Sequence, residues 1–212
     1  MEIYSYETLP STQRYLFEQI EAKHLKAPVA LYCKRQNAGV GSRDNSWIGT
    51  EGDLFLSFAL ELQSLPKDLS LGSASIYFAY LMKSILSHYQ KDIWLKWPND
   101  IYSGAYKIGG VITQKYQNTV ICGIGVNLHN KPTTAFKSLE IDISIEDLIE
   151  KYLYTLEQFP SWKQIFSEYQ IEFEQSRRFL VHIDKSKKSL KDAHLCKDGS
   201  LLIEGKRVYS LR

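Results

Sequence analysis

The 212-residue sequence contains only three cysteines, and they are widely separated: Cys33, Cys122 and Cys196. An odd number of isolated cysteines forms neither a disulfide framework nor a C-x-x-C zinc or redox motif, and it suits a reducing compartment. No apolar run approaches the roughly 20 residues of a membrane-spanning helix. The first ten residues also lack the basic and apolar regions of a secretory signal. We therefore expect a cytoplasmic protein that does not enter a membrane.

An excess of one charge is lacking as well. The 26 basic and 24 acidic residues leave a formal net charge of +2, which is too small to predict nucleic-acid binding. The five histidines show no metal-ligand spacing, and the sequence has no internal repeat. With 44% hydrophobic residues, the chain is long enough to bury one sizeable core and to carry a small appendage.

Hydrophobic periodicity predicts a mixture of helices and strands. Ser11 is a candidate N-cap for a first helix, and residues 73–89 are apolar nearly all round, which predicts a buried helix. Ser144 and Ser161 are candidate N-caps for two later amphipathic helices. Strands are predicted at residues 29–34, 54–61, 93–97, 107–115 and 119–127, and the last two should form a hairpin.

The pattern changes to short strands from about residue 176. They are predicted at residues 179–183, 201–204 and 207–211, with Asp198-Gly199 and Gly205-Lys206 as turn signals. So short a segment cannot bury much apolar surface by itself. We therefore predict a main domain of residues 1–175 and a small β domain of residues 176–212 that packs on it.

The predicted hairpin has an unusual distribution of glycine. Gly123 and Gly125 share one face of the second strand with Asn127, whereas the other face is apolar. Because glycine weakens a strand, such a pair indicates that a ligand lies flat on the backbone or that an aromatic side chain covers it. On the first strand Lys107 and Gly109 share one face. If this face and the glycine face of the second strand point to the same side of the sheet, Lys107 stands beside Asn127. That arrangement requires an odd number of residues in the turn.

The string K-W-P-N-D at residues 96–100 is a second candidate for binding. Its proline makes the preceding residue extended and interrupts the strand, so Asn99 and Asp100 project from a strand end. Ligands gather at strand ends, but the same string is also simply a good turn.

A third candidate is the polar segment from Gln36 to Trp47. Gly39, Gly41 and Arg43 make it a possible anion-binding loop. It lacks the third glycine of a dinucleotide-binding fingerprint.

Together these segments resemble the biotin protein ligase family. The family's motifs are matched, in order, by Ser11-Thr12-Gln13, by residues 36–47 (compare Q-x-A-G-R-G-R-x-G-R-x-W), by an intact K-W-P-N-D, by residues 107–112 and by G-x-G-x-N at 123–127. The resemblance covers essentially the whole chain. It implies an α+β fold of the class II synthetase type, a mixed or antiparallel sheet with helices on it, followed by a small C-terminal SH3-like β-barrel.

The resemblance also implies an activity. The protein would activate biotin with ATP and Mg²⁺ to biotinyl-5'-adenylate and transfer the biotin to a lysine of the biotin carboxyl carrier protein of acetyl-CoA carboxylase. The implied catalytic residues are Lys107 and Arg43. Lys107 would lie between the biotin carboxylate and the α-phosphate, two anions that repel by about 4 kcal/mol at roughly 4 Å and an effective dielectric of about 20.

The binding residues follow from the same resemblance. Those implied for biotin are Ser11, Thr12, Gln13, Gln36, Gly39, Val40, Gly41, Lys107, Gly109, Gly110 and Gly123. Those implied for ATP or the adenylate are Ser42, Arg43, Trp47, Lys96, Asn99, Asp100, Gly125 and Asn127. No residues are implied to hold a metal ion of the protein's own.

The sequence departs from the family in the glycine-containing loop. Val40, Ser42 and Asn45 stand where the family usually has arginine, which implies a weaker hold on the phosphate of the adenylate. Only residues 1–10 precede Ser11, so we expect no N-terminal DNA-binding domain and no DNA partner. A monomer or a homodimer fits the sequence equally well.

Two other functions remain open. A lipoate or octanoate ligase or transferase shares the fold, but K-W-P-N-D and Asn127 favour biotin. A non-catalytic biotin or nucleotide sensor would fit the loss of loop arginines, whereas the presence of Lys107 argues for a catalyst.

Overall fold

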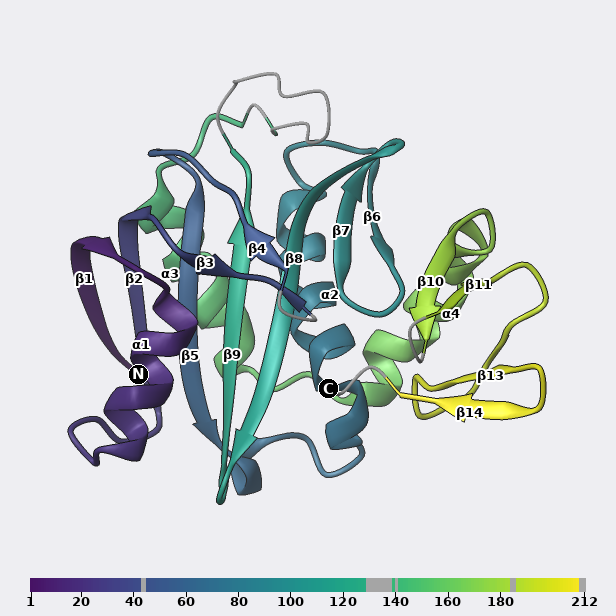
Figure 1. The fold of residues 1–212 in the computed structure, drawn as a ribbon, viewed down its shortest axis with the longest axis horizontal. Helices are drawn as coiled ribbons and strands as arrows, with labels where there is room; N and C mark the ends of the chain where they lie inside the picture. Colours follow the sequence, from purple (N-terminus) through teal and green to yellow (C-terminus); the bar gives the residue numbers. More distant parts are fainter. Residues whose placement is uncertain (43–44, 129–138, 140, 184–185, 210–212) are drawn as a thin grey trace.

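The computed structural model describes residues 1–42, 45–128, 139, 141–183 and 186–209. Its main feature is a seven-stranded sheet in the order β1-β2-β5-β9-β8-β7-β6, in which only β1 and β2 are parallel neighbours (Figure 1). The strands are β1 (Glu2–Leu9), β2 (Val29–Gln36), β5 (Leu54–Glu61), β6 (Ile93–Lys96), β7 (Asp100–Ser103), β8 (Tyr106–Tyr116) and β9 (Thr119–Val126). A mixed sheet with helices on it confirms the predicted α+β class.

Helices cover both faces of the sheet. α1 (Thr12–Glu21) packs on one face, where Leu16 joins a core formed with β2, β5 and β9. α2 (Ala74–Leu86) packs on the other face, and nearly all of its side chains are buried, as its apolar sequence predicted. α3 (Ile145–Glu157) and α4 (Trp162–Ser176) contribute to the same larger core.

The three predicted N-caps are confirmed. The hydroxyl oxygens of Ser11, Ser144 and Ser161 accept hydrogen bonds from the third residue beyond each cap, at 3.3, 3.0 and 3.3 Å. Each bond satisfies one of the backbone N–H groups that a helix leaves free at its start. No helix in the described ranges is long and apolar enough to cross a bilayer.

The sheet contains two strands that the sequence did not predict. β1 has no consistent apolar face, because among its side chains only Leu9 is buried, and its strand state comes from pairing with β2. β7 begins at Asp100, inside the segment interpreted as a turn, and pairs with β6. Within the long loop before β5, the short strands β3 (Gly39–Val40) and β4 (Ser46–Trp47) pair with each other.

The predicted hairpin of β8 and β9 is present, but the expected odd turn is wrong. Tyr116 pairs with Thr119, which leaves two residues in the turn. Gly110 therefore lies opposite Gly125, and Gly109 lies opposite Val126 on the face of the larger core.

An irregularity in β8 compensates for this shift. Gly109 pairs with Ile101 of β7, whereas Lys107 pairs with the next residue, Tyr102. The extra residue, Ile108, makes a β-bulge, which reverses the alternation of faces along one strand. Lys107 and Gly110 consequently point to the same side of the sheet.

The C-terminal residues form two small sheets beside α4 (Figure 1). They are β10 (Leu180–Ile183) with β11 (Ser186–Ser189), and β12 (His194–Leu195) with β13 (Leu201–Ile203) and β14 (Lys206–Val208). β11 and β12 were not predicted. β14 ends at Val208, and the predicted strand residues 210–211 lie outside the described residues. Val181, Leu201 and Ile203 join the larger core, so these strands pack on the main domain.

Candidate active site

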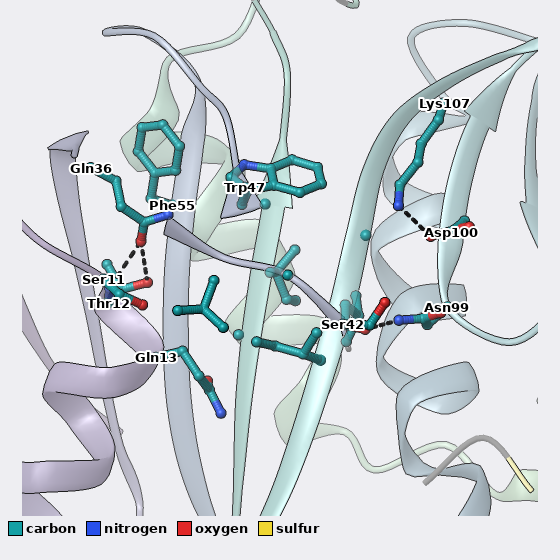
Figure 2. A pocket seen from close by; sticks show the side chains of 18 residues that line it. Ser11, Thr12, Gln13, Gln36, Ser42, Trp47, Phe55, Asn99, Asp100 and Lys107 are labelled. Carbon is teal, nitrogen blue, oxygen red and sulfur yellow. Dashed lines mark hydrogen bonds and ion pairs between the residues drawn. The ribbon is translucent and has the colours of Figure 1, made fainter. Parts of the chain in front are cut away.

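A hollow lies on the face of the sheet that carries α1, and most of the predicted site residues line it (Figure 2). Its walls come from the start of α1, the end of β2, the β3–β4 segment and the centres of β8 and β9. The lining residues are Ser11, Thr12, Gln13, Gln36, Val40, Gly41, Ser42, Trp47, Phe55, Asn99, Asp100, Lys107, Gly110, Val111, Ile112, Gly123, Ile124 and Gly125.

The hollow continues into a larger cleft of about 620 Å³ that reaches β10. Lys96 lines this cleft, as do Arg14 and His182. Gly39, Gly109 and Asn127 were also predicted to bind ligands, but they line neither space. Arg43, the second predicted catalytic residue, lies outside the described residues.

The start of α1 is tied to the end of β2. The Oε1 atom of Gln36 accepts a hydrogen bond from the Thr12 backbone N–H at 2.9 Å and from its hydroxyl at 3.3 Å (Figure 2). The Thr12 hydroxyl in turn accepts a hydrogen bond from Ser57, a fully buried residue of β5. This network fixes the polar end of the hollow, and sequence reasoning did not identify Ser57 as part of it.

Trp47 lies over Gly125. A methyl group added to Gly125 would come within 2.6–2.8 Å of the indole ring, so the ring rests on the backbone of β9. The interpretation that an aromatic side chain covers the glycine is therefore confirmed at this position. The covering residue is itself one that the family resemblance assigns to the ligand.

Gln13 covers Gly123 in a similar way. A methyl group on Gly123 would lie 2.7 Å from the Gln13 Oε1 atom. The Gln13 side-chain amide donates a hydrogen bond to the Ile121 carbonyl at 3.3 Å. Among the described residues, the buried Oε1 of Gln13 and the buried Nε1 of Trp47 have no hydrogen-bond partner. The hollow thus contains one unpaired acceptor and one unpaired donor.

Lys107 points into the hollow and pairs with Asp100 (Figure 2). Its Nζ lies 2.5 Å from the Asp100 Oδ1 and 5.8 Å from the centre of the Trp47 ring. The second oxygen of Asp100 lies 3.6 Å from the Nζ of Lys96. One carboxylate between two ammonium groups leaves this end of the hollow with a net positive charge, which suits an anionic ligand.

The K-W-P-N-D segment folds as a tight connection between β6 and β7. The Asn99 side-chain amide donates a hydrogen bond to the Val111 carbonyl, and the Val111 N–H donates to the Asn99 carbonyl at 3.0 Å. Asn99 and Asp100 are therefore held against β8 beside Lys107. The Asn127 N–H donates to the Ile108 carbonyl at 2.8 Å, which places Asn127 beside the residue that follows Lys107. The predicted proximity of the Lys107 and Asn127 side chains stays a prediction.

Asp53 is a residue near the site that sequence reasoning missed. It is 4% exposed, and its carboxylate accepts hydrogen bonds from the backbone N–H groups of Thr50 at 2.7 Å and Leu128 at 2.8 Å. It thereby joins the segment after Trp47 to the end of β9. The sequence signal that could have identified Asp53 was its position as an acidic residue directly before the strongly apolar strand β5.

Carboxylates are scarce in this region. Asp100 is the one acidic residue that lines the described hollow and cleft. Within the described ranges, no group of three or more histidine, cysteine, aspartate or glutamate side chains is arranged to hold a metal ion.

Comparison of the chain with known proteins identifies its family. Residues 5–129, more than half of the chain, match the model of the Biotin/lipoate A/B protein ligase family. Biotin--protein ligase 2 of Arabidopsis thaliana is 32% identical in an alignment of 129 residues that covers 55% of this chain and 39% of that protein. The bifunctional ligase/repressor BirA of Escherichia coli is 29% identical in an alignment of 127 residues that covers 57% of this chain and 38% of that protein. The alignments thus span well under half the length of these relatives.

Solved structures agree over a larger share of the chain. The biotin acetyl coenzyme A carboxylase synthetase from Helicobacter pylori, with bound biotinylated ATP, is 39% identical, with a TM-score of 0.92 over 99% of this chain and 100% of that chain. The biotin protein ligase from Aquifex aeolicus, in complex with biotin and ATP, is 20% identical, with a TM-score of 0.77 over 100% of this chain and 96% of that chain, and supports the fold alone. The resemblance inferred from the motifs is confirmed, and the chain belongs to the biotin/lipoate A/B protein ligase family.

Proposed function

We propose that this protein is an ATP-dependent biotin protein ligase. It converts biotin and ATP into biotinyl-5'-adenylate and diphosphate, and then transfers the biotin to a lysine of the biotin carboxyl carrier protein of acetyl-CoA carboxylase. The observation that carries the proposal is the Lys107 ammonium group, which points into a hollow lined by the residues that the family motifs supply.

Lys107 is suited to the first step. A biotin carboxylate oxygen attacks the α-phosphorus of ATP, a new P–O bond forms, and the bond to diphosphate breaks. An ammonium group between the two anions offsets their repulsion and stabilises the negative charge that develops on the phosphoryl oxygens. Asp100 holds this group in place before substrates bind. The negative charge of Asp100 would weaken the attraction for anions, and the positive charge of Lys96 offsets it. Positioning and charge neutralisation supply most of the catalysis in such a transfer.

The second step uses the same site. The neutral amine of the acceptor lysine attacks the acyl carbon of the adenylate, and AMP leaves with its electron pair as the amide forms. Water competes with the amine, so the intermediate has to be covered. The β3–β4 segment, whose Gly41 and Ser42 line the hollow, is the element suited to cover it.

The unpaired buried Oε1 atom of Gln13 favours biotin over lipoate. An unsatisfied buried donor or acceptor costs about 1–3 kcal/mol, and a ligand that pairs with it recovers that energy. The Oε1 atom of Gln13 requires a donor. The ureido ring of biotin has N–H groups, whereas the dithiolane ring and the acyl chain of lipoate have none.

ATP would bring Mg²⁺ with it. Asp100, the lining carboxylate, already pairs with two ammonium groups, so we propose that phosphate oxygens hold the ion.

Residues 1–175 would form the catalytic domain, and residues 176–212 the SH3-like barrel, of which the two small C-terminal sheets would be parts. The role of Arg43, the cytoplasmic location, the absence of a DNA partner and the choice between monomer and homodimer stay predictions from the sequence.

A transfer assay tests the proposal. The protein is incubated with labelled biotin, MgATP and a carrier domain of acetyl-CoA carboxylase, and in parallel with labelled lipoate. We expect labelled carrier with biotin alone. Lys107→Ala should lower the rate by on the order of 100- to 1,000-fold, the usual effect of removing one group that stabilises developing charge.

Lys188→Ala is the matched control. This lysine pairs with Glu204 in the C-terminal strands and does not line the hollow or the cleft, so its removal should leave the rate unchanged. A Lys107→Ala protein with the wild-type rate, or transfer of lipoate in place of biotin, contradicts the proposed function.

A further inference from the structure

The turn between β12 and β13 is held by side chains of the main domain at three consecutive carbonyl groups. The acceptors are the carbonyls of residues 197, 198 and 199. Their donors are the Trp162 indole N–H at 2.8 Å, the Ser73 hydroxyl, and the Trp97 indole N–H at 2.9 Å. The donors come from three separate parts of the chain, so the turn is docked from several directions at once.

The close approach depends on Gly199. Its φ of +80° lies in the left-handed region that favours glycine. A methyl group at this position would lie 2.6 Å from the Ser73 hydroxyl oxygen and 3.0 Å from a carbon of the Trp162 ring. No side chain fits between the turn and the groups that hold it, which accounts for the glycine in the Asp198-Gly199 turn signal.

Trp97 connects this turn to the candidate active site. It is fully buried, its backbone N–H donates to the hydroxyl of Ser176 at 3.2 Å, and its ring N–H donates to the Gly199 carbonyl. Trp97 belongs to the short connection that also carries Asn99 and Asp100. The connection is therefore held on one side by the end of α4 and the C-terminal turn, and on the other side by β8 through Asn99.

We propose that the turn at residues 197–199 positions the active-site connection at residues 96–100, with Trp97 as the positioning residue. The bond from Trp97 to the Gly199 carbonyl sets where Asp100 lies, and Asp100 sets where the Lys107 ammonium lies. The turn thus contributes to the formation of the adenylate although it lines neither the hollow nor the cleft. This inference rests on the proposed ligase function.

Trp162 offers a matched control within the same turn. Trp97 and Trp162 are both buried, at 0% and 4% exposed, and each donates one indole hydrogen bond to the turn. Only Trp97 lies in the connection to the site. Replacing either indole by phenylalanine removes one donor and keeps an aromatic ring, so both variants lose a similar interaction.

The experiment measures the single-turnover rate constant of adenylate formation for the wild-type protein, Trp97→Phe and Trp162→Phe. A rate constant does not depend on the fraction of protein that is folded, so a general loss of stability does not alter it. We expect Trp97→Phe to be slower by at least about 10-fold, because a displacement of roughly 1 Å can cost on the order of 100-fold. Trp162→Phe should remain within about 2-fold of wild type, because Ser73 and Trp97 still hold the turn.

Hydrogen exchange of the two variants gives a readout that needs no activity. Faster amide exchange at residues 96–100 in Trp97→Phe but not in Trp162→Phe supports the inference. Equal slowing of adenylate formation in both variants, an unchanged rate in Trp97→Phe, or unchanged exchange overturns it. If the wild-type protein forms no adenylate, the proposed function fails, and the exchange comparison still decides whether the turn holds the connection.

A measurement on the unsubstituted protein covers the case in which Trp97→Phe does not fold. The four tryptophans are replaced by 5-fluorotryptophan, and the ¹⁹F resonances are followed as biotin and a non-hydrolysable ATP analogue are added. A shift of the Trp97 resonance without a shift of the Trp162 resonance supports the coupling. A Trp97 resonance that ligands leave unchanged overturns it.

Discussion

The ammonium group of Lys107 owes its place to one extra residue in β8. Regular alternation from Gly110 would put Ile108 in the hollow and turn Lys107 toward the larger core. The bulge at Ile108 restores Lys107 to the open face, where Asp100 receives it. Bulges commonly redirect a side chain in this way next to active sites. The alternation of side chains along a strand does not reveal a bulge. The sequence analysis therefore put Lys107 on the correct face, but it did so by assuming an odd turn in place of the bulge.

At Gly125 the structure supplies a test of how closely Trp47 rests on the backbone. We expect Gly125→Ala to lower the free energy of unfolding by about 1–3 kcal/mol, the usual cost of overpacking, because the added methyl group collides with the indole ring. In a Trp47→Ala background the same change should cost little, because the ring is gone. Urea unfolding of the four proteins of this double-mutant cycle measures the coupling.

Gly110→Ala is the control for that cycle. The residue lies directly opposite Gly125, but a methyl group there makes only an ordinary contact, with neighbours at 3.6 Å. Its unfolding free energy should stay within about 0.5 kcal/mol of wild type. If Gly125→Ala is tolerated equally well, Trp47 does not rest on β9 in solution.

Among the elements, α1 combines a structural and a functional role at its first turn. The Ser11 hydroxyl caps the helix and also lines the hollow, whereas the Ser144 hydroxyl caps α3 alone. We expect Ser11→Ala and Ser144→Ala each to cost about 1 kcal/mol of stability. Ser11→Ala should in addition raise the KM for biotin by roughly 3- to 10-fold, the equivalent of one lost hydrogen bond. Thermal unfolding and transfer kinetics of the two variants separate the effects, and equal KM values would argue against a ligand contact at Ser11.

The elements also show what local sequence patterns contain. The caps and the helices were predicted because their signals lie within a few neighbouring residues. The face of Gly109 in the β8–β9 hairpin was mispredicted, because it depends on the number of residues in the turn. β1 was missed for two reasons. Neither of its faces is consistently apolar, and its partner β2 follows only after α1. Pairing between distant segments is the information that periodicity lacks.

At the scale of the whole molecule, the strand order creates the site. The residues of the hollow run from position 11 to position 125 in the sequence, and the order β2-β5-β9-β8-β7 brings their strands side by side. The family motifs identified most of these residues. They did not identify Phe55, which lines the hollow, or Ser57, which supports it, because a side chain inside an apolar strand gives no sign of which face it joins.

The free cysteines test whether the molecule behaves as one cooperative unit. Burial raises the pKa of Cys33 to about 11 and raises the pKa of Cys122 well above its ordinary value, whereas Cys196 is only half-buried. A raised pKa keeps a thiol protonated, and only the thiolate reacts. At pH 8 we therefore expect a thiol reagent to label Cys196 in the native protein and to leave Cys33 and Cys122 unlabelled.

Urea then distinguishes one folding unit from several. Cys33 and Cys122 lie in the two cores on opposite faces of the sheet, and the C-terminal strands share the larger of these cores. Because the central strands belong to both cores, loss of one should remove the other, as in the all-or-none unfolding of most single domains. We expect both thiols to become reactive at the urea concentration at which tryptophan fluorescence changes. Labelling of Cys33 at a lower concentration than Cys122 would mean that α1, the edge strand β1 and its neighbour β2 unfold separately, and the polar end of the hollow with them.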